Sequence, residues 1–243
     1  MSHLENIRAN ATNRDLIEGQ LQHLGIAVFM GIGACSLLVR VDDGPWYLML
    51  NTVTWAKFAI ILAIVHQFVV AAVFRLQLYK NWMSKRFGDR DMQVWAAIFM
   101  PLLIARPLLI MLTGWSDTTP ITGIRPAEII LGLALIGVAG YGLYSVLEYF
   151  TLPRALGGDH FRDEYAQMPL VNQGIYKYTD NGMYGVVFLG LSGIALLYGS
   201  WNALVVALFQ HAYIWVHMYC TEGPDMRRIY GTRLTEKEAP PTV

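Results

Sequence analysis

Six apolar stretches divide the chain, with polar segments between them. A helix that crosses a bilayer needs about 20 mostly apolar residues. The stretches that reach or approach this length are 21–39, 58–74, 93–113, 129–147, 183–198 and 201–219. The pattern predicts an all-α integral membrane protein with about six transmembrane helices.

Two of these stretches have features of their own. The third is interrupted by Pro101, Arg106 and Pro107. Because a proline inside a helix removes a backbone hydrogen bond, a break there is predicted in one of the two interpretations of Arg106 given below. Only Gly199 and Ser200 separate the fifth stretch from the sixth. The last two helices are therefore expected to form a tight helical hairpin.

The distribution of basic residues predicts the orientation. With six spans, the N-terminus, the loops after the second and fourth helices, and the C-terminus lie on one side of the membrane. Fourteen of the eighteen Lys and Arg residues fall on that side, including Arg75, Arg90, Arg162, Arg233 and Lys237. Since cytoplasmic loops carry an excess of Lys and Arg, both termini are assigned to the cytosol.

Composition supports a membrane protein and excludes other classes. Hydrophobic residues make up 55% of the 243 residues and charged residues 15%, against about 25% charged in an average soluble protein. Eighteen acidic residues balance the eighteen basic ones. This excludes a disordered chain and a nucleic-acid binder that relies on a basic field. The expected partner is the lipid bilayer, with no nucleic acid and, because no His, Cys, Asp or Glu cluster has ligand spacing, no metal.

Arg106 is a formal charge well inside a predicted span. A charge at the bilayer centre costs about 2.5–3.5 kcal/mol on insertion scales, so it needs a partner or access to water. Two interpretations stay open. In one, the helix breaks at the prolines and Arg106 extends to the interface; in the other, it is a pocket cation for an anionic lipid phosphate.

The C-terminal part carries the candidate chemistry. We divide the chain into residues 1–125, with the first three helices, and residues 126–243, a core with the last three. The long loop 148–182 is rich in aromatic residues, which favours an ordered structure. On the last helix, His211, Trp215, Met218 and Glu222 fall at i, i+4, i+7 and i+11, which is one face of an α-helix.

This part of the chain resembles a known family. The relevant sequences are Gly174-Ile175-Tyr176-Lys177-Tyr178, then Asp180-Asn181-Gly182-Met183-Tyr184, the helical hairpin, Glu222-Gly223-Pro224 and Ile229-Tyr230. In this order they resemble the membrane-embedded phospholipid methyltransferases, which comprise phosphatidylethanolamine N-methyltransferases and are grouped with isoprenylcysteine carboxyl methyltransferases. The resemblance covers about residues 149–230. It implies a helical membrane fold, S-adenosylmethionine as the cofactor and a lipid-like acceptor.

The resemblance also implies site residues. Gly158-Asp159-His160-Phe161 is similar to a Gly-Asp-Tyr-Phe stretch at the family's cofactor site. The segment Asp180-Asn181-Gly182-Met183-Tyr184 is similar to the family's Asp-Asn-Pro-Met-Tyr. Glu222-Gly223-Pro224 is similar to its Glu-Glu-Pro. Gly182 thus replaces a proline, which should loosen the start of the fifth helix, and Gly223 replaces a second glutamate. The implied cofactor-binding residues are Gly158, Asp159, His160, Tyr176, Tyr178, Asn181, Gly182, Met183, Tyr184 and Glu222.

The chemistry of the cofactor agrees with these residue types. S-adenosylmethionine carries a sulfonium, an amino group and a carboxylate. Carboxylates such as Glu222 suit its cations, and the backbone N–H groups at the helix start after Asn181 suit its anion. Tyr176, Tyr178 and Tyr184 offer rings for stacking and cation–π contact.

Methyl transfer to an ammonium requires removal of a proton, because an amine with a pKa near 10 is protonated at neutral pH. The candidate catalytic residues are His211, Asp180, Glu222 and Tyr184, with His160 as a further proton acceptor. We expect the amine near His211, Tyr184 and Glu222. The candidate substrate-binding residues are Arg106 and Arg154 for the lipid phosphate, with Arg162 as a further cation, and Trp215 for the route inward.

The leading hypothesis is methyl transfer to the amine of phosphatidylethanolamine or its partly methylated forms. A second is a methyltransferase for another membrane-partitioned acceptor, such as an isoprenylcysteine carboxylate or a small thiol. A third is a non-catalytic membrane protein, such as a transporter or assembly factor, that retains the fold.

Overall fold

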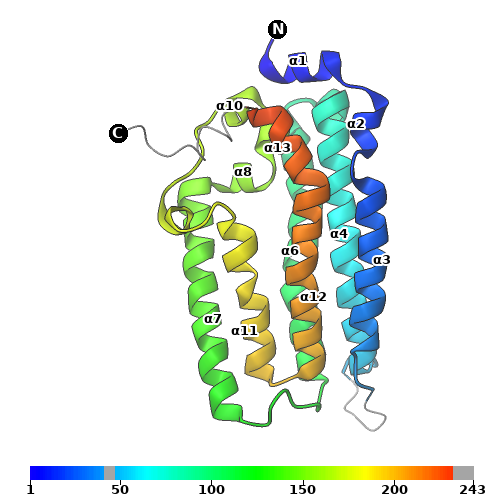
Figure 1. Ribbon diagram of the computed structural model, residues 1–243, viewed down its shortest axis with the longest axis vertical. Helices are drawn as coiled ribbons and strands as arrows, with labels where there is room; N and C mark the ends of the chain where they lie inside the picture. The colour runs from blue at the N-terminus through cyan, green and yellow to red at the C-terminus, as the bar shows by residue number, and fades with distance from the viewer. Residues whose placement is uncertain (41–46, 232–243) are drawn as a thin grey trace.

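The computed structural model describes residues 1–40 and 47–231 (Figure 1). Long helices run side by side along the long axis of the molecule and form one bundle. Their bounds are Gln20–Ser36 (α3), Thr52–Lys80 (α4), Asp91–Trp115 (α6), Arg125–Ser145 (α7), Leu189–Tyr198 (α11) and Trp201–His217 (α12). The described residues contain no β-strand, so the predicted all-α class is confirmed.

Helix α12 holds the bundle together. It packs against α3, α4, α6 and α11, whereas α7 packs mainly on α11. Small residues lie where α4 and α12 meet, among them Ala59 and Ala63 of α4 and Ala203 and Ala207 of α12, all fully buried. Small side chains let helix backbones approach closely, which is how membrane helices gain packing energy.

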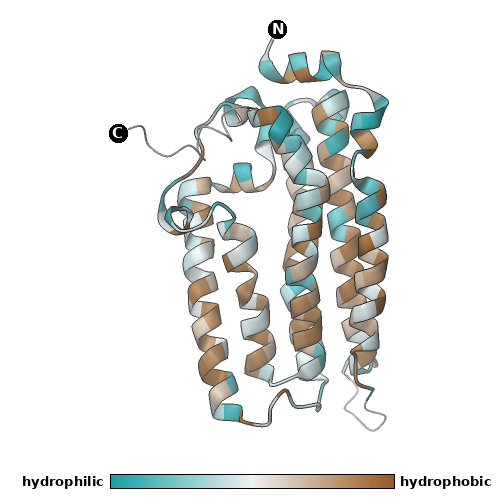
Figure 2. Cartoon of the chain, in the orientation of Figure 1, coloured by the Kyte–Doolittle hydropathy of each residue, from teal (hydrophilic) through white to brown (hydrophobic). Residues whose placement is uncertain are grey.

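Hydrophobic residues predominate along the bundle, and hydrophilic residues collect at the end that carries α1 and α13 (Figure 2). Four helical segments are long and apolar enough to cross a membrane: Thr52–Lys80, Trp82–Trp115, Arg125–Phe150 and Trp201–Tyr230. The predicted first and fifth spans are shorter, because α3 has 17 residues and the apolar fifth segment runs only from Met183 to Tyr198. The chain is an integral membrane protein, and a count of six spans stays a prediction.

The predicted break in the third span is wrong. Helix α6 is continuous from Asp91 to Trp115 with both prolines inside it. Proline is tolerated in membrane helices when neighbouring groups satisfy the freed backbone. Arg106 does not extend to the interface: it is 2% exposed, and its Nε donates to the Gln210 Oε1 at 2.7 Å.

The predicted tight hairpin is present. Gly199 ends α11 in the left-handed conformation (φ 66°), where a side chain would be strained. The Ser200 side chain then accepts a hydrogen bond from the Ala203 N–H and caps α12.

Short elements cover the hydrophilic end of the bundle. Their bounds are His3–Asn10 (α1), Asn13–Ile17 (α2), Trp82–Phe87 (α5), Gly88–Arg90 (η1), Val146–Phe150 (η2), Leu152–Ala155 (α8), Gly158–Phe161 (α9), Asp163–Ala166 (α10), Gly174–Lys177 (η3), Met183–Val187 (η4), Met218–Glu222 (η5) and Gly223–Tyr230 (α13). Several of them belong to the loop 148–182, which is ordered as predicted.

The N-terminal segment is tied to α13 at this end. The Nη2 of Arg228 lies 2.6 Å from the Asp15 Oδ1 and 2.9 Å from the Glu18 Oε2, and the His3 Nε2 lies 2.7 Å from the Ile229 carbonyl oxygen. Helices α1 and α13 therefore share one end of the bundle (Figure 1). An even number of spans requires this arrangement.

Arg75 is not the loop cation that the sequence indicated. It lies inside α4, 2% exposed, and its Nε is 3.1 Å from the Oδ2 of Asp225. The apolar stretch ends at Phe74, so the sequence placed Arg75 at the start of a loop, but α4 continues to Lys80. Arg233 and Lys237 lie outside the described residues.

Candidate functional site

A cavity of about 460 Å³ lies at the hydrophilic end, between α4, the loop 148–182 and the continuous helix from α12 to α13. This volume is in the range of small-molecule and cofactor sites. Its lining residues are Phe74, Phe150, Arg154, Ala155, Gly157, Asp159, His160, Leu170, Val171, Tyr176, Asp180, Asn181, Met183, Tyr184, Met218, Glu222, Gly223, Met226, Arg227 and Tyr230.

Three π-helical turns supply part of this lining. Phe150 comes from η2, Met183 and Tyr184 from η4, and Met218 and Glu222 from η5. A π-helical turn widens a helix locally and occurs frequently at functional sites. The three turns thus present side chains to the cavity in directions that regular α-helices would not give.

A buried polar network forms one wall. The His160 Nδ1 lies 2.8 Å from the Asp159 Oδ1, and its Nε2 lies 3.6 Å from the Oδ2 of Asp225. Asp225 in turn pairs with Arg75 and accepts a hydrogen bond from the Tyr79 hydroxyl at 2.9 Å. Burial disfavours the charged imidazole, but the two carboxylates outweigh it and raise the pKa of His160 to about 10. His160 is therefore a cation at neutral pH.

Helix α4 contributes an aromatic side to this wall. The ring of Phe74 stacks on that of His160, with 4.3 Å between the ring centroids. Gly157 makes this possible: it has φ 78°, and a Cβ there would lie 2.3 Å from the Phe74 Cζ. A residue with a side chain at this position would both strain the backbone and displace Phe74.

Aromatic rings line the opposite wall. Phe150 and Tyr176 stack with their centroids 5.7 Å apart, and the Arg154 guanidinium lies 4.9 Å from the Phe150 centroid. Burial raises the pKa of Tyr176 to about 12, so its hydroxyl stays neutral. This wall offers flat apolar surface with a cation beside it.

Glu222 and Tyr184 meet at the inner side of the cavity. The Tyr184 hydroxyl donates a hydrogen bond to the Glu222 Oε1, and the His217 Nε2 lies 3.4 Å from the same oxygen. Tyr184 is at the start of the fifth predicted helix and Glu222 at the end of the sixth, so the hairpin brings together two residues 38 positions apart.

Nine of the predicted site residues line the cavity: Arg154, Asp159, His160, Tyr176, Asp180, Asn181, Met183, Tyr184 and Glu222. They come from four separate segments of sequence, and the fold brings them together. Their assigned roles stay predictions.

Six predicted site residues do not line it. Tyr178 is 79% exposed. Gly158 lies against the Pro153 carbonyl oxygen and Tyr165, and Gly182 lies against Ile175. Arg106 has its guanidinium 4.9 Å from the Phe188 centroid.

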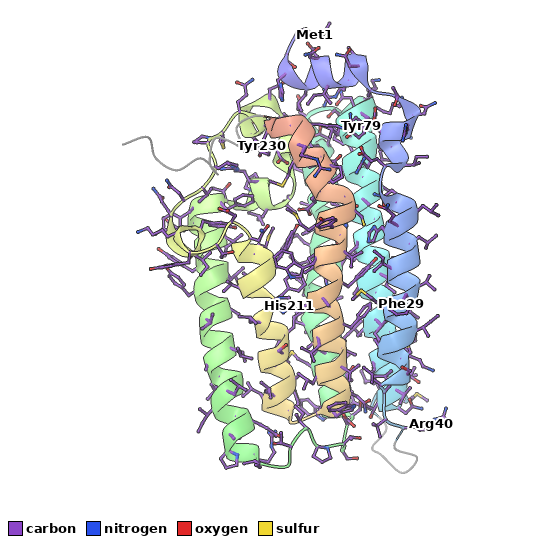
Figure 3. The ribbon with its side chains drawn as sticks, viewed as in Figure 1. Met1, Phe29, Arg40, Tyr79, His211 and Tyr230 are labelled. Carbon is purple, nitrogen blue, oxygen red and sulfur yellow. The ribbon has the colours of Figure 1, made fainter. Side chains whose placement is uncertain are left out.

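His211 and Trp215 are the other two. His211 lies midway along α12, on the side of α11 (Figure 3), with its ring centroid 5.9 Å from that of Phe188. Trp215 packs edge-to-face on Tyr184, with 6.5 Å between centroids. The predicted stripe fails because η5 inserts one additional residue into the helix. Each residue turns an α-helix by about 100°, so Glu222 points away from the face of His211.

Several lining residues were not among the predicted site residues. Phe74 lies outside the part that carries the resemblance, and nothing in its local pattern marks it. Arg227 could have been identified from the sequence, because it is a cation five positions after the predicted site residue Glu222. It is exposed at the cavity.

The part of the chain that the structure describes contains no group of three or more His, Cys, Asp or Glu side chains that could hold a metal ion. The charged groups that face the cavity are instead three carboxylates, of Asp159, Asp180 and Glu222, and three cations, of Arg154, His160 and Arg227. Such a site suits a small molecule with charges of both signs. Fold and site together define an integral membrane protein with a polar small-molecule site at one end of its bundle.

Comparison with known proteins identifies the family. The family model for phospholipid methyltransferase matches residues 127–233. This segment, which contains most of the cavity lining, belongs to the phospholipid methyltransferase family.

Among curated proteins, the phosphatidylethanolamine N-methyltransferase of Malassezia globosa is 31% identical over 225 residues, which are 82% of this chain and 22% of that protein. That of Laccaria bicolor is 33% identical over 109 residues, which are 43% of this chain and 11% of that protein. The chain spans less than a quarter of the length of these relatives. No solved structure gives a significant match.

Proposed function

We propose that this chain transfers a methyl group from S-adenosylmethionine to the amine of phosphatidylethanolamine or its partly methylated forms. The observation that carries the proposal is the Glu222–Tyr184 pair in a cavity at the hydrophilic end of the bundle, inside the segment that matches the family. A carboxylate at this depth can meet a lipid head group whose tails stay in the bilayer.

The cavity fits the cofactor. Carboxylates of Asp159, Asp180 and Glu222 suit its amino group and sulfonium, and the rings of Phe150 and Tyr176 suit its adenine. The buried Arg154 Nε has no hydrogen-bond partner among the described residues; a ligand carboxylate would supply one. When bound, S-adenosylmethionine provides an electrophilic methyl group.

The chain's own residues perform the remaining tasks. The lining residues hold the acceptor in line with the methyl group, and the bound cofactor and lipid displace water from the cavity. Glu222 takes the proton of the ammonium, because it is the lining carboxylate that also contacts the family residue Tyr184. Arg227, an exposed cation at the cavity, binds the lipid phosphate.

The topology follows from the same arrangement. We propose that α3 and the Met183–Tyr198 segment also lie in the membrane, which gives six spans with both termini in the cytosol. The polar cofactor then reaches the cavity from the cytosol and the lipid from the side. Cysteine labelling tests this: residue 85 should react from the cytosol and residue 57 from the opposite side.

Expression in a bacterial host that makes phosphatidylethanolamine but no phosphatidylcholine tests the function. Lipid mass spectrometry should show methylated phosphatidylethanolamine with the wild type and at least hundredfold less with Glu222→Gln, a loss typical of a proton-transfer residue. Glu148→Gln, a matched change of an exposed glutamate outside the cavity, should leave the product unchanged.

Other outcomes separate the alternatives. Another membrane acceptor would be indicated if the protein binds the cofactor, forms no methylated phosphatidylethanolamine and methylates a carboxylate or thiol. The rate with such an acceptor should not show the rise with pH that comes from amine deprotonation. Absence of cofactor binding in calorimetry would indicate a non-catalytic protein.

A further inference from the structure

His217 is a fully buried histidine directly behind the cavity. Its exposed fraction is 0%, and neither ring nitrogen has a hydrogen-bond partner within the described residues. The closest polar atom given for it is the Glu222 Oε1, 3.4 Å from its Nε2. His217 does not line the cavity, and its contact with the Glu222 carboxylate connects it to the site.

The π-helical turn η5 creates this contact. Residues five apart lie on nearly opposite sides of an α-helix, because five residues turn it by about 500°. In a π-helix the hydrogen bonds join residues five apart, as the Gly223 N–H and Met218 carbonyl do here. His217 and Glu222 are five apart, and the turn places them one above the other.

Methyl transfer to an ammonium leaves one proton to be removed. The nitrogen first loses a proton, its lone pair then forms the bond to the methyl carbon, and the carbon–sulfur pair stays on sulfur. The product is again a cationic amine and a neutral thioether. The proton remains on the acceptor carboxylate, which must pass it on before the next turnover. A proton acceptor behind the carboxylate takes this proton without passing it through the space that donor and lipid are proposed to occupy.

We propose that His217 accepts this proton from Glu222 and passes it away from the cavity, toward α3. The inference rests on the proposed function and adds a residue that acts through Glu222. A neutral imidazole with a free lone pair is the side chain best suited to this transfer near neutral pH.

A second histidine lies beside His217 in the direction of α3. His23 of α3 faces it edge-on, with 5.6 Å between ring centroids. His23 is in hydrogen-bond contact with the Tyr213 hydroxyl of α12 at 2.9 Å, and its Nδ1 lies 3.4 Å from the Gln20 Oε1. Gln20 is half-buried at the start of α3, so this side leads toward solvent.

Basic groups lie on the remaining sides. His66 of α4 interacts electrostatically with both His217 and the buried Arg106 of α6. Tyr184 of η4 contacts Glu222. On the ring of His217, Glu222 is the carboxylate in contact, and His23 is the imidazole that faces it.

The test compares His217→Gln with His66→Gln. His66 is the matched control because it is also fully buried with two unpartnered ring nitrogens, but it packs on Phe99 and not on Glu222. With phosphatidylethanolamine at pH 7, His217→Gln should lower kcat at least tenfold and leave cofactor affinity unchanged, whereas His66→Gln should change kcat less than threefold. The loss of kcat in His217→Gln should become smaller as the pH rises toward values at which the lipid amine is neutral, because a neutral amine has no proton to lose before it attacks.

An acceptor with a weakly basic amine separates proton transfer from structure. A phosphatidylethanolamine analogue with fluorine atoms beside the amine is neutral at pH 7. His217→Gln should methylate this analogue at the wild-type rate. Equal deficits with both acceptors, or no deficit with either, would overturn the proposal. Failure of the wild type to methylate either acceptor would instead overturn the proposed function.

Two further measurements cover a variant that does not fold, which loss of cofactor binding would reveal. His217→Asn keeps a polar side chain of similar size and should show the same deficit and the same rescue. If neither variant folds, the ¹⁵N signals of the His217 ring in the wild type should change on Glu222→Gln, because the proposal requires the two side chains to exchange a proton. Signals that Glu222→Gln leaves unchanged would overturn the proposal.

Discussion

The hydroxyl of Tyr230, the last residue of α13, donates a hydrogen bond to the Asp159 Oδ2 across 2.9 Å. Seventy-one residues separate the two. Asp159 also lies beside the His160 imidazolium, so the bond joins the end of the last described helix to the charged wall of the cavity. Tyr230 of the closing Ile229-Tyr230 pair thus has a structural task, because it holds a cavity-facing carboxylate in place.

We expect Tyr230→Phe to lower the free energy of unfolding by about 1–2 kcal/mol, because the half-buried carboxylate of Asp159 loses one donor. Cofactor affinity should fall as well. Thermal unfolding and calorimetry check both effects. Tyr178→Phe, at an exposed tyrosine, should change neither; an equal effect of the two changes would refute the role of the bond.

The Arg75–Asp225 pair predicts a non-additive effect on stability. Removing one member leaves an uncompensated buried charge, so Arg75→Met and Asp225→Leu should each cost about 3–5 kcal/mol, whereas the double variant should recover much of the loss. Thermal unfolding of the three variants measures this coupling. Additive losses would show that the two charges do not act as a pair.

His160 predicts a dependence of stability on pH. Its pKa is raised from an ordinary value of 6.5 to about 10, with burial opposing and the carboxylates of Asp159 and Asp225 favouring the charge. Its contribution to stability is therefore present in full below about pH 6.5 and is lost as the pH rises to about 10. The melting temperature should fall across this window. His160→Gln should be less stable than the wild type at pH 6.5, and its melting temperature should change less with pH across this window.

Gly182 predicts a coupled pair of substitutions. It has helical dihedral angles (φ −54°, ψ −38°) that suit the proline of the family pattern, but a Cβ there would lie 2.5 Å from the Ile175 Cγ2. Gly182→Ala should thus cost about 1–3 kcal/mol through overpacking. In the Ile175→Ala background the same change should cost much less, as thermal unfolding would show. An undiminished cost would place its cause elsewhere.

The sequence predicted the parts of the site that depend on local order along the chain. Gly199-Ser200 predicted the hairpin, and the hairpin brings Tyr184 to Glu222. Apolar length predicted the bundle helices. These features follow from residues close together in the chain, or from motifs that keep their order.

It did not predict the contacts that depend on distant partners. Arg75 looks like a loop cation because its partner, Asp225, lies 150 positions away and its apolar stretch has just ended. Phe74 has a neighbour in His160 only because Gly157 leaves room. The prediction that His211 and Glu222 share a face rests on a constant rotation of 100° per residue. A π-helical turn changes this rotation, and the amino-acid composition does not reveal the turn.

The same π-helical turn adds one residue to the last helix without changing the direction in which the helix runs. A π turn is an α-helix that has absorbed one inserted residue, so the helix leaves it on nearly the heading with which it entered. A chain one residue shorter between Met218 and Glu222 would still deliver α13 to Arg75 and Tyr79, and the bundle would close as before. His217 and Glu222 would then be four apart, an interval that also places two residues on one face of a regular α-helix. The π turn therefore sets which sequence interval joins the histidine to the acid, and it leaves the anchoring of α13 unchanged.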